Sequence, residues 1–409
     1  MLAKVLIVGL VGGLLIGQTI RAPLPGQGGG ILLSDLLVIG VLLYALKIRL
    51  PAKEQETVWR TLALMLPFIV WALFTLLVNS WRYEAAQLAI AAAYWLRLAA
   101  YLLLLPALLA LLVGRTAAVR WLVRGMMVVA ICLVALGLAQ LVWLPDLRVL
   151  GAGWDPHLGR MVSTWLDPNF LGLFFVFSGA LATSVLAASR QRLLPGLGLL
   201  ASALGLVMTE SRSALVAALV TLGLLSPLLM SRHRQWIAQH RLAVFLLGVS
   251  LSGLLILSAA LLGQRALGLA TGDATIALRF ESLAAVWQLA QQHGLIGVGY
   301  NGYQFVAQEA GLIARFSSHS RAGADSSLLT LWVTTGLAGV MLFLASWVTL
   351  ARQLLQRWQA GAPLALAGVG SIVAVATHSL FVNSWLYAHL LVSLVVIVAL
   401  GLVSSKQTL

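Results

Sequence analysis

The sequence predicts an all-α, polytopic membrane protein with about twelve transmembrane helices and one large periplasmic loop that contains short helices. Of its 409 residues, 61% are hydrophobic and 9% are charged, whereas roughly a quarter of the residues in soluble domains are charged. Apolar stretches of about 18 or more residues recur along the whole chain, and each can cross a bilayer core as a helix. Lipid offers the backbone no hydrogen-bond partners, so these stretches are expected to be helical.

The predicted spans follow one another with short connections. They cover residues 4–20, 31–46, 58–79, 86–112, 119–142, 168–188, 193–208, 213–230, 242–263, 325–350, 361–381 and 384–403. The first is expected to be an uncleaved helix rather than a signal peptide, because its apolar core is long and further spans continue to the end of the chain. The fourth is long and contains Arg97 and Pro106, a proline at which we expect the helix to kink, tilt or break. Cys132 is the single cysteine, which excludes an intrachain disulfide.

The positive charge of the chain reports its orientation in the membrane. The net charge is +14, but the basic residues are dispersed over short loops and do not form the patch of a nucleic-acid-binding domain. If the N-terminus lies in the cytoplasm, most of the basic loop residues fall in cytoplasmic loops, as the positive-inside rule requires. These residues are Lys47, Arg49, Lys53, Arg115, Arg120, Arg190, Arg192, Arg232, Arg234, Arg241, Arg352 and Arg357.

One connection is much longer than the others and divides the chain. We expect an N-terminal bundle of about nine spans in residues 1–263, a periplasmic loop in 264–324 and about three spans in 325–409. A loop of this length is usually functional or disordered, and its amphipathic, aromatic sequence favours order. The first half of the chain has no counterpart of this loop, which weighs against a transporter built from repeats.

Arginines near the outer face are candidates for a functional site, because charge is costly near lipid unless it faces a polar cavity or the interface. In "HLGRMVSTWLDPNFLG", Arg160 precedes a helix that starts with Asp167 as its N-cap and Pro168 in its first turn. The free amides of such a helix start can bind an anion. Alternatively, Asp167 only caps the helix and Arg160 contacts lipid headgroups.

A second arginine lies in the short turn of "VMTESRSALVAALV". Two apolar stretches meet there, and a turn this short cannot extend far into solvent, so we expect Arg212 to line a cavity. The alternative is a local ion pair between Glu210 and Arg212.

The third arginine, Arg279, lies in the large loop, in "ALRFESLAAVWQLAQQHGLIGVGYNGYQF". It has helical spacing to Leu283 and Trp287, which indicates an amphipathic helix on the membrane surface. The glycines that follow are a weak match to a phosphate-binding loop, because no strand precedes them and no Lys-Ser/Thr pair follows.

The end of the large loop, "HSRAGADSSLLTLWVTTGLAG", carries the candidate proton acceptors Asp325 and His319. A serine hydrolase is disfavoured, since the chain has no G-x-S-x-G motif and sequence adjacency does not make a catalytic triad. His293, His319 and Asp325 are too scattered to predict a metal site. We therefore expect neither a metal nor another cofactor.

Four of these pieces resemble the O-antigen ligase and O-antigen polymerase superfamily of bacterial membrane glycosyltransferases. In the family's order they are "DPNFLG", "TESRSALV", the arginine and tryptophan ahead of "GLIGVGYNGYQF", and "ADSSLLTLWVTTGLAG". The resemblance covers about residues 145–400 and is strongest over 160–340. Each motif is degenerate alone, but their order and their placement on one membrane face make the match fairly specific.

The resemblance implies roles for the individual residues. Arg212 and Arg279, with Arg160 as a weaker third, would bind the diphosphate of an undecaprenyl-diphosphate-linked glycan, and guanidinium groups suit that role because they stabilise phosphate charge without a metal. The family's usual histidine falls on Asp325, eleven residues before Gly336. A carboxylate can also accept the proton of an attacking hydroxyl, and His319 is the alternative acceptor.

The resemblance also implies an enzyme of the bacterial inner membrane with a periplasmic active site. It would transfer a glycan from undecaprenyl diphosphate to an acceptor hydroxyl in the assembly of O-antigen or another surface polysaccharide. The acceptor would be a lipid-linked sugar for a polymerase, which the "DS" pair slightly favours, or the lipid A core for a ligase. Besides membrane lipids, a chain-length regulator is a candidate partner. The alternative function is a transporter or flippase of lipid-linked oligosaccharide.

Overall fold

The chain folds into a helical bundle, which we describe from a computed structural model. The structure describes residues 2–23, 30–150, 158–232, 283–284, 286–311 and 324–405. The predicted span at 242–263 and much of the loop at 264–324, including Arg279 and His319, lie outside these residues. The division of the chain at 263 and 324 therefore stays a prediction.

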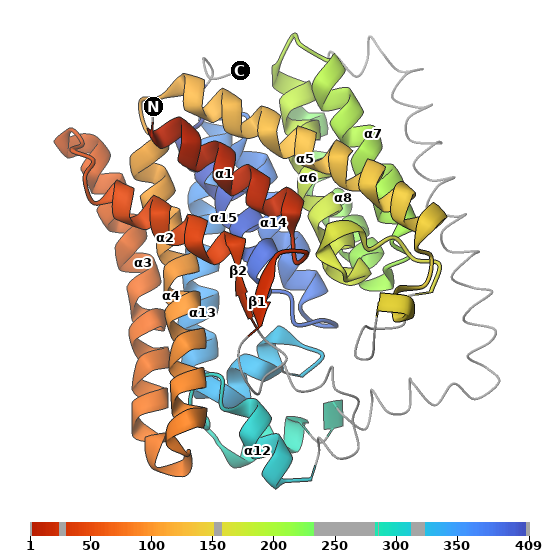
Figure 1. The fold of residues 1–409 in the computed structure, drawn as a ribbon. Helices are drawn as coiled ribbons and strands as arrows, with labels where there is room; N and C mark the ends of the chain where they lie inside the picture. Colours follow the sequence, from red (N-terminus) through yellow and green to blue (C-terminus); the bar gives the residue numbers. More distant parts are fainter. Residues whose placement is uncertain are drawn as a thin grey trace.

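The described helices match the positions of the other predicted spans, apart from one short helix, Tyr303–Glu309, which lies in the predicted loop 264–324. They are α1 (Leu2–Ile16), α2 (Leu33–Ala45), α3 (Ala52–Val78), α4 (Ala85–Leu112), α5 (Thr116–Trp143), α6 (Pro168–Ala188), α7 (Leu193–Met208), α8 (Arg212–Arg232), α12 (Tyr303–Glu309), α13 (Ser327–Gln359), α14 (Ala365–His378) and α15 (Ala388–Val403). Short 3₁₀ helices η1 (Ser80–Arg82), η2 (Leu147–Leu150) and η3 (Ser163–Trp165) lie in the connections. In Figure 1, α12 lies at the lower end of the bundle, and α1 begins at the upper end.

Among the described helices, six are long and apolar enough to cross a membrane: α3, α4, α5, α6, α8 and α13. The estimate of about twelve full spans therefore holds only in part. Five further helices, α1, α2, α7, α14 and α15, lie at predicted spans but have 10–17 residues. α1 ends early because Gly17 adopts a left-handed φ of 59°, and a Cβ at this position would lie 2.4 Å from the carbonyl oxygen of Thr164.

A short antiparallel hairpin departs from the all-α prediction. Strands β1 (Arg21–Pro23) and β2 (Gly30–Leu32) pair Arg21 with Leu32 and Pro23 with Gly30. Proline lacks an amide hydrogen and disfavours a helix beyond its first turn. The backbone amides and carbonyls of this segment between α1 and α2 therefore form hydrogen bonds between two strands instead.

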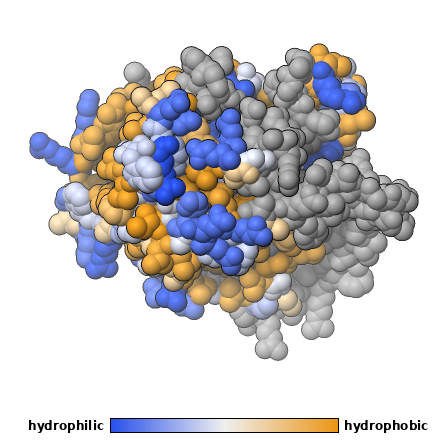
Figure 2. Space-filling model, turned by 90° about the horizontal axis from the view of Figure 1, so that it is seen from below, coloured by the Kyte–Doolittle hydropathy of each residue, from blue (hydrophilic) through white to orange (hydrophobic). Residues whose placement is uncertain are grey.

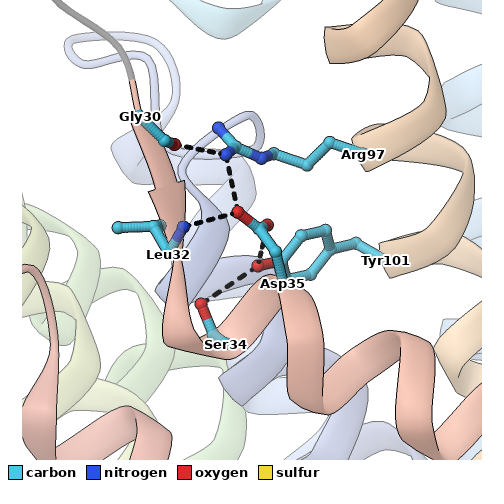
Figure 3. A network of polar contacts seen from close by, with 6 residues as sticks. All are labelled: Gly30, Leu32, Ser34, Asp35, Arg97 and Tyr101. Carbon is cyan, nitrogen blue, oxygen red and sulfur yellow. Dashed lines mark hydrogen bonds and ion pairs between the residues drawn. The ribbon is translucent and has the colours of Figure 1, made fainter. Parts of the chain in front are cut away.

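An ion pair connects the first turn of α2 to the middle of α4, and the same arginine bonds to the hairpin. The Nη2 of Arg97 donates to Asp35 Oδ2 at 2.6 Å and to the carbonyl oxygen of Gly30 at 2.5 Å. Asp35 also accepts from the Leu32 amide and the Tyr101 hydroxyl, both at 2.8 Å (Figure 3). The charge of Arg97, which the sequence left unexplained within a span, is therefore paired and hydrogen-bonded. α4 continues through Pro106 as a single helix.

α15 forms the centre of the bundle. Every residue from His389 to Leu402 is buried, as expected for a helix that is apolar on all sides. It packs against α4, α6 and α14. α3, α5 and α8 instead leave much of their apolar surface uncovered, which is the surface that lipid contacts in a membrane protein.

α13 is interrupted near its start. Gly336 has φ 69° and ψ 177°, which are not helical values, so the residues before and after it form two helical segments. The break lies inside the predicted span 325–350, and nothing in the hydropathy pattern indicated it. Residues 293–299 pack against α13 at this break.

Candidate functional site

The turn between α7 and α8, residues 209–211, brings two of the predicted arginines together. Glu210 has a left-handed φ of 48°, which reverses the chain, and α8 begins at Arg212. Arg160 arrives from the α5–α6 connection, and its Nε donates to the carbonyl oxygen of Thr209 at 3.0 Å. Its Nη2 donates to the carbonyl oxygen of Glu210 at 3.4 Å. We call residues 209–211 the arginine turn.

The two arginines differ in exposure. Arg160 is half-buried because its guanidinium contacts the arginine turn, whereas the side chain of Arg212 is exposed at the first position of α8. The ion pairs within the described residues are Arg60–Glu56, Arg97–Asp35 and Arg148–Asp146, and a Glu210–Arg212 pair is not among them. The guanidinium of Arg212 is thus exposed, while that of Arg160 is hydrogen-bonded to the turn that precedes Arg212.

The "DPN" motif joins the same cluster. Asp167 caps α6, as the sequence predicts, and its carboxylate accepts from the amides of Asn169 at 2.7 Å and Phe170 at 3.2 Å. The side-chain oxygen of Asn169 accepts from Arg160 Nη2 at 3.3 Å and from the Ser211 hydroxyl at 3.1 Å. The capping motif therefore does more than start a helix, because its asparagine bonds both to Arg160 and to Ser211 of the arginine turn.

A buried histidine extends the cluster, and sequence reasoning missed it. His378, the last residue of α14, lies with its Nε2 2.9 Å from the Ser213 hydroxyl and its Nδ1 2.5 Å from the Ser384 hydroxyl. Ser213 in turn lies 3.3 Å from the Ser211 hydroxyl. The available signal was the polar run "THS" at the end of an otherwise apolar span, but no motif linked it to the arginine turn.

Asp325 lies immediately before α13. The N-cap of the helix is Ser326, so Asp325 stands just outside the helix and not at the first position of a span 325–350, as the sequence predicted. Its side chain is exposed. Burial, aided by the negative charge of Asp325, raises the pKa of Tyr303 on α12 to about 12, so this phenol stays neutral beside the carboxylate.

The glycines of "HGLIGVG" allow the backbone of this segment to lie close to the backbone of α13. Residues 293–299, which we call the docked segment, occupy the break in α13. The amides of Val298 and Gly299 donate to the carbonyl oxygens of Val333 at 2.8 Å and Thr334 at 2.9 Å. A Cβ on Gly336 would lie 1.9 Å from the carbonyl oxygen of Leu295. This close packing explains the glycines without a phosphate-binding loop.

Side chains from α3 and the α3–α4 connection also bond to the docked segment. Asn79 Nδ2 donates to the carbonyl oxygen of Gly297 at 3.2 Å, and the Tyr83 hydroxyl donates to that of Val298. In α13, next to the break, the carbonyl oxygen of Thr335 accepts from Trp71 Nε1 at 2.8 Å.

Viewed from below, the described surface carries a group of hydrophilic residues among hydrophobic ones (Figure 2).

The structure thus places Arg160 and Arg212 at one turn and Asp325 at the start of α13, while Arg279 and His319 lie outside the described residues. Across the part of the chain that is described, no group of three or more His, Cys, Asp or Glu side chains could hold a metal ion.

Comparison with known proteins supports the resemblance seen in the sequence. Residues 197–344 match the family model described as O-antigen ligase, which confirms the resemblance over these residues. The matched range includes the arginine turn, the docked segment and Asp325, but it is shorter than the expected 145–400 and excludes "DPNFLG". No curated protein matches the chain.

Proposed function

From the match of residues 197–344 to the O-antigen ligase family, which implies glycosyltransferase activity and lipid-linked glycan substrates, we propose a specific reaction. The protein transfers a glycan from undecaprenyl diphosphate to an acceptor sugar hydroxyl at the periplasmic face of the bacterial inner membrane. The observation that carries this proposal is the arginine turn, which places the exposed Arg212 beside the half-buried Arg160.

The role of the arginines follows from the chemistry of the leaving group. When the bond between the anomeric carbon and the phosphate oxygen breaks, negative charge grows on the diphosphate. A guanidinium group stabilises that charge through paired hydrogen bonds. Arg212 contacts the diphosphate in this proposal, and Arg160 holds the arginine turn through the carbonyl oxygens of Thr209 and Glu210. Arg279 is proposed as a second diphosphate ligand.

Asp325 is the proposed proton acceptor. The acceptor hydroxyl loses its proton to the Asp325 carboxylate as its oxygen attacks the anomeric carbon from the side opposite the diphosphate, so the configuration inverts. The exposed position of Asp325 makes it accessible to a sugar. His319 is the alternative acceptor. The activated donor supplies the driving force, so no nucleotide sugar enters the reaction.

The acceptor distinguishes two versions of this function. A polymerase uses the terminal sugar of another lipid-linked repeat, and a ligase uses the lipid A core. We favour the polymerase slightly because aspartate followed by serine replaces the family's histidine at positions 325 and 326. Offering each acceptor separately to purified protein in liposomes, together with a labelled undecaprenyl-diphosphate glycan, decides between them by the product that forms.

The same assay tests the arginine assignment. We expect Arg212→Ala to lower the transfer rate by about 100-fold, because removal of one oxyanion-stabilising donor typically costs this much. Arg148→Ala is the matched control, since Arg148 is exposed in the α5–α6 connection and pairs with Asp146 at 2.6 Å, apart from the arginine turn. Equal rates for the two variants contradict the assignment.

Asp325 is tested with two substitutions. Asp325→Ala and Asp325→Asn both remove the proton acceptor, and both are expected to abolish transfer while the protein remains folded. Retention of activity in both would transfer the role to His319. If wild-type protein moves the labelled lipid across the liposome bilayer without forming a product, the protein is a flippase and the proposed reaction is wrong.

A further inference from the structure

The end of α14 and the turn that follows it contact both parts of the proposed site. Residues 379–387, which we call the connecting turn, join His378 at the end of α14 to the start of α15. On one side, His378 lies 2.9 Å from the hydroxyl of Ser213, the residue that follows Arg212. The start of α8 is therefore hydrogen-bonded to the end of α14.

On its other side, the connecting turn bonds to the start of α13. The carbonyl oxygen of Ser379 accepts from the Ser326 hydroxyl at 3.1 Å and from the Ser327 amide at 3.0 Å. The Ser327 hydroxyl accepts from the Trp385 amide at 3.0 Å. Ser326 and Ser327 directly follow Asp325, so the connecting turn holds the residues on which the position of the carboxylate depends.

Each ring nitrogen of His378 has a hydroxyl partner. Nδ1 lies 2.5 Å from the Ser384 hydroxyl, which also lies 3.2 Å from the carbonyl oxygen of Val382. Nε2 lies 2.9 Å from the Ser213 hydroxyl, and both contacts are hydrogen bonds whichever ring nitrogen carries the proton. His378 and Ser379 are fully buried, so water does not replace these bonds at low cost.

We propose that His378 is a positioning residue that fixes the separation between Arg212 and Asp325. The inference rests on the proposed function, in which the diphosphate and the proton acceptor lie on opposite sides of the reacting carbon. An error of about 1 Å in such an arrangement can cost about 100-fold in rate. His378 lies outside the matched range 197–344, so the family match does not assign it a role.

The two amide substitutions of His378 separate positioning from simple packing. The side chain of glutamine reaches to about the position of Nε2, so His378→Gln keeps an acceptor for Ser213. Asparagine is one methylene shorter and reaches only to about the position of Nδ1, so His378→Asn keeps the contact with Ser384 and loses that with Ser213. Both variants remove the ring, so lost packing affects them similarly.

Transfer kinetics in liposomes give the first test. We expect His378→Gln to stay within about threefold of wild type and His378→Asn to lose about 10- to 100-fold in kcat with little change in KM, as for a group that acts on the transition state. His389→Gln is the control, because His389 is a second buried histidine and no side chain among the described residues bonds to its ring nitrogens. Equal losses in the Asn and Gln variants, or a change in KM alone, overturn the inference.

A distance measurement tests the positioning without relying on activity. Nitroxide labels at Arg212→Cys and Asp325→Cys, with Cys132 replaced by serine, report the separation by pulsed electron spin resonance. We expect one narrow distance distribution with His378 or His378→Gln and a broader or shifted one with His378→Asn. Unchanged distributions overturn the inference even if transfer is observed. An absence of transfer in wild type, combined with a distribution that responds to His378→Asn, contradicts the proposed function and leaves the positioning role supported.

Discussion

The docked segment and the arginine turn both join parts of the chain that are distant in sequence, but they do so with different atoms. The docked segment meets α13 through backbone amides and carbonyls, and a Cβ on Gly297 or Gly336 would collide with the opposing backbone. The arginine turn is held by side chains, from Arg160, Asn169 and Ser211. Substitutions should therefore affect folding in the first region and reaction rate in the second.

The largest expected effect is that of Gly336→Ala. Gly336 has a φ of 69°, and its Cβ would lie 1.9 Å from the carbonyl oxygen of Leu295, so the docked segment cannot stay in place. We expect a loss of about 3 kcal/mol or more, seen as little folded protein in detergent by size-exclusion chromatography. Gly223→Ala in α8 is the control, since a Cβ there meets nothing within 4 Å. Similar yields of the two variants would show that backbone docking is dispensable.

In the arginine turn, Arg160→Ala should reduce transfer more than folding. We expect a decrease of about 10- to 100-fold in kcat/KM because the turn that carries Arg212 loses its contacts from Arg160. Arg160→Lys should behave like Arg160→Ala, since a lysine amine cannot reproduce contacts made by both Nε and Nη2. Full activity of the lysine variant would mean that charge alone is required.

A smaller effect is expected for a side chain that supports the docked segment. Asn79→Ala removes the bonds from Nδ2 to the carbonyl oxygens of Gly297 at 3.2 Å and Thr75 at 2.8 Å. The loss of buried hydrogen bonds should lower stability by about 1–2 kcal/mol, measured by thermal unfolding in detergent. Activity per folded molecule should not change. A loss of activity without a loss of stability would contradict the distinction between the docked segment and the arginine turn.

The smallest expected effect concerns His293, at the start of the docked segment. Burial and the charge of Arg82 lower its pKa from the usual 6.5. The unfolded chain then binds a proton at a higher pH than the folded one, so stability falls as the pH drops below about 6.5. His293→Gln should lose less thermal stability than wild type between pH about 7.5 and 5.5. An identical loss in both proteins would contradict this linkage.

Much of the helical pattern was predictable, since apolar length and polar interruptions determine where helices form in a membrane. The Asp167 cap was also accessible from the "DPN" motif, and the sequence predicted Arg160 and Arg212 at turns on the same side of the membrane, where Arg160 is found to bond to the turn before Arg212. The break at Gly336 was not, since it depends on a segment about 40 residues earlier in the chain docking against it. His378 was missed for a similar reason: its partners Ser213 and Ser384 come from other elements, and hydropathy records only that it ends a span.

The central position of α15 has a consequence for how the bundle assembles during synthesis. α15 packs against α4, α6 and α14, and all of these are made before it. Chains fold from the N-terminus as they emerge from the ribosome, so the earlier helices insert while the interior that α15 will occupy is still unfilled. Lipid or neighbouring helices must cover their inner faces in that interval. The final packing of this bundle is therefore an event that follows translation of α15.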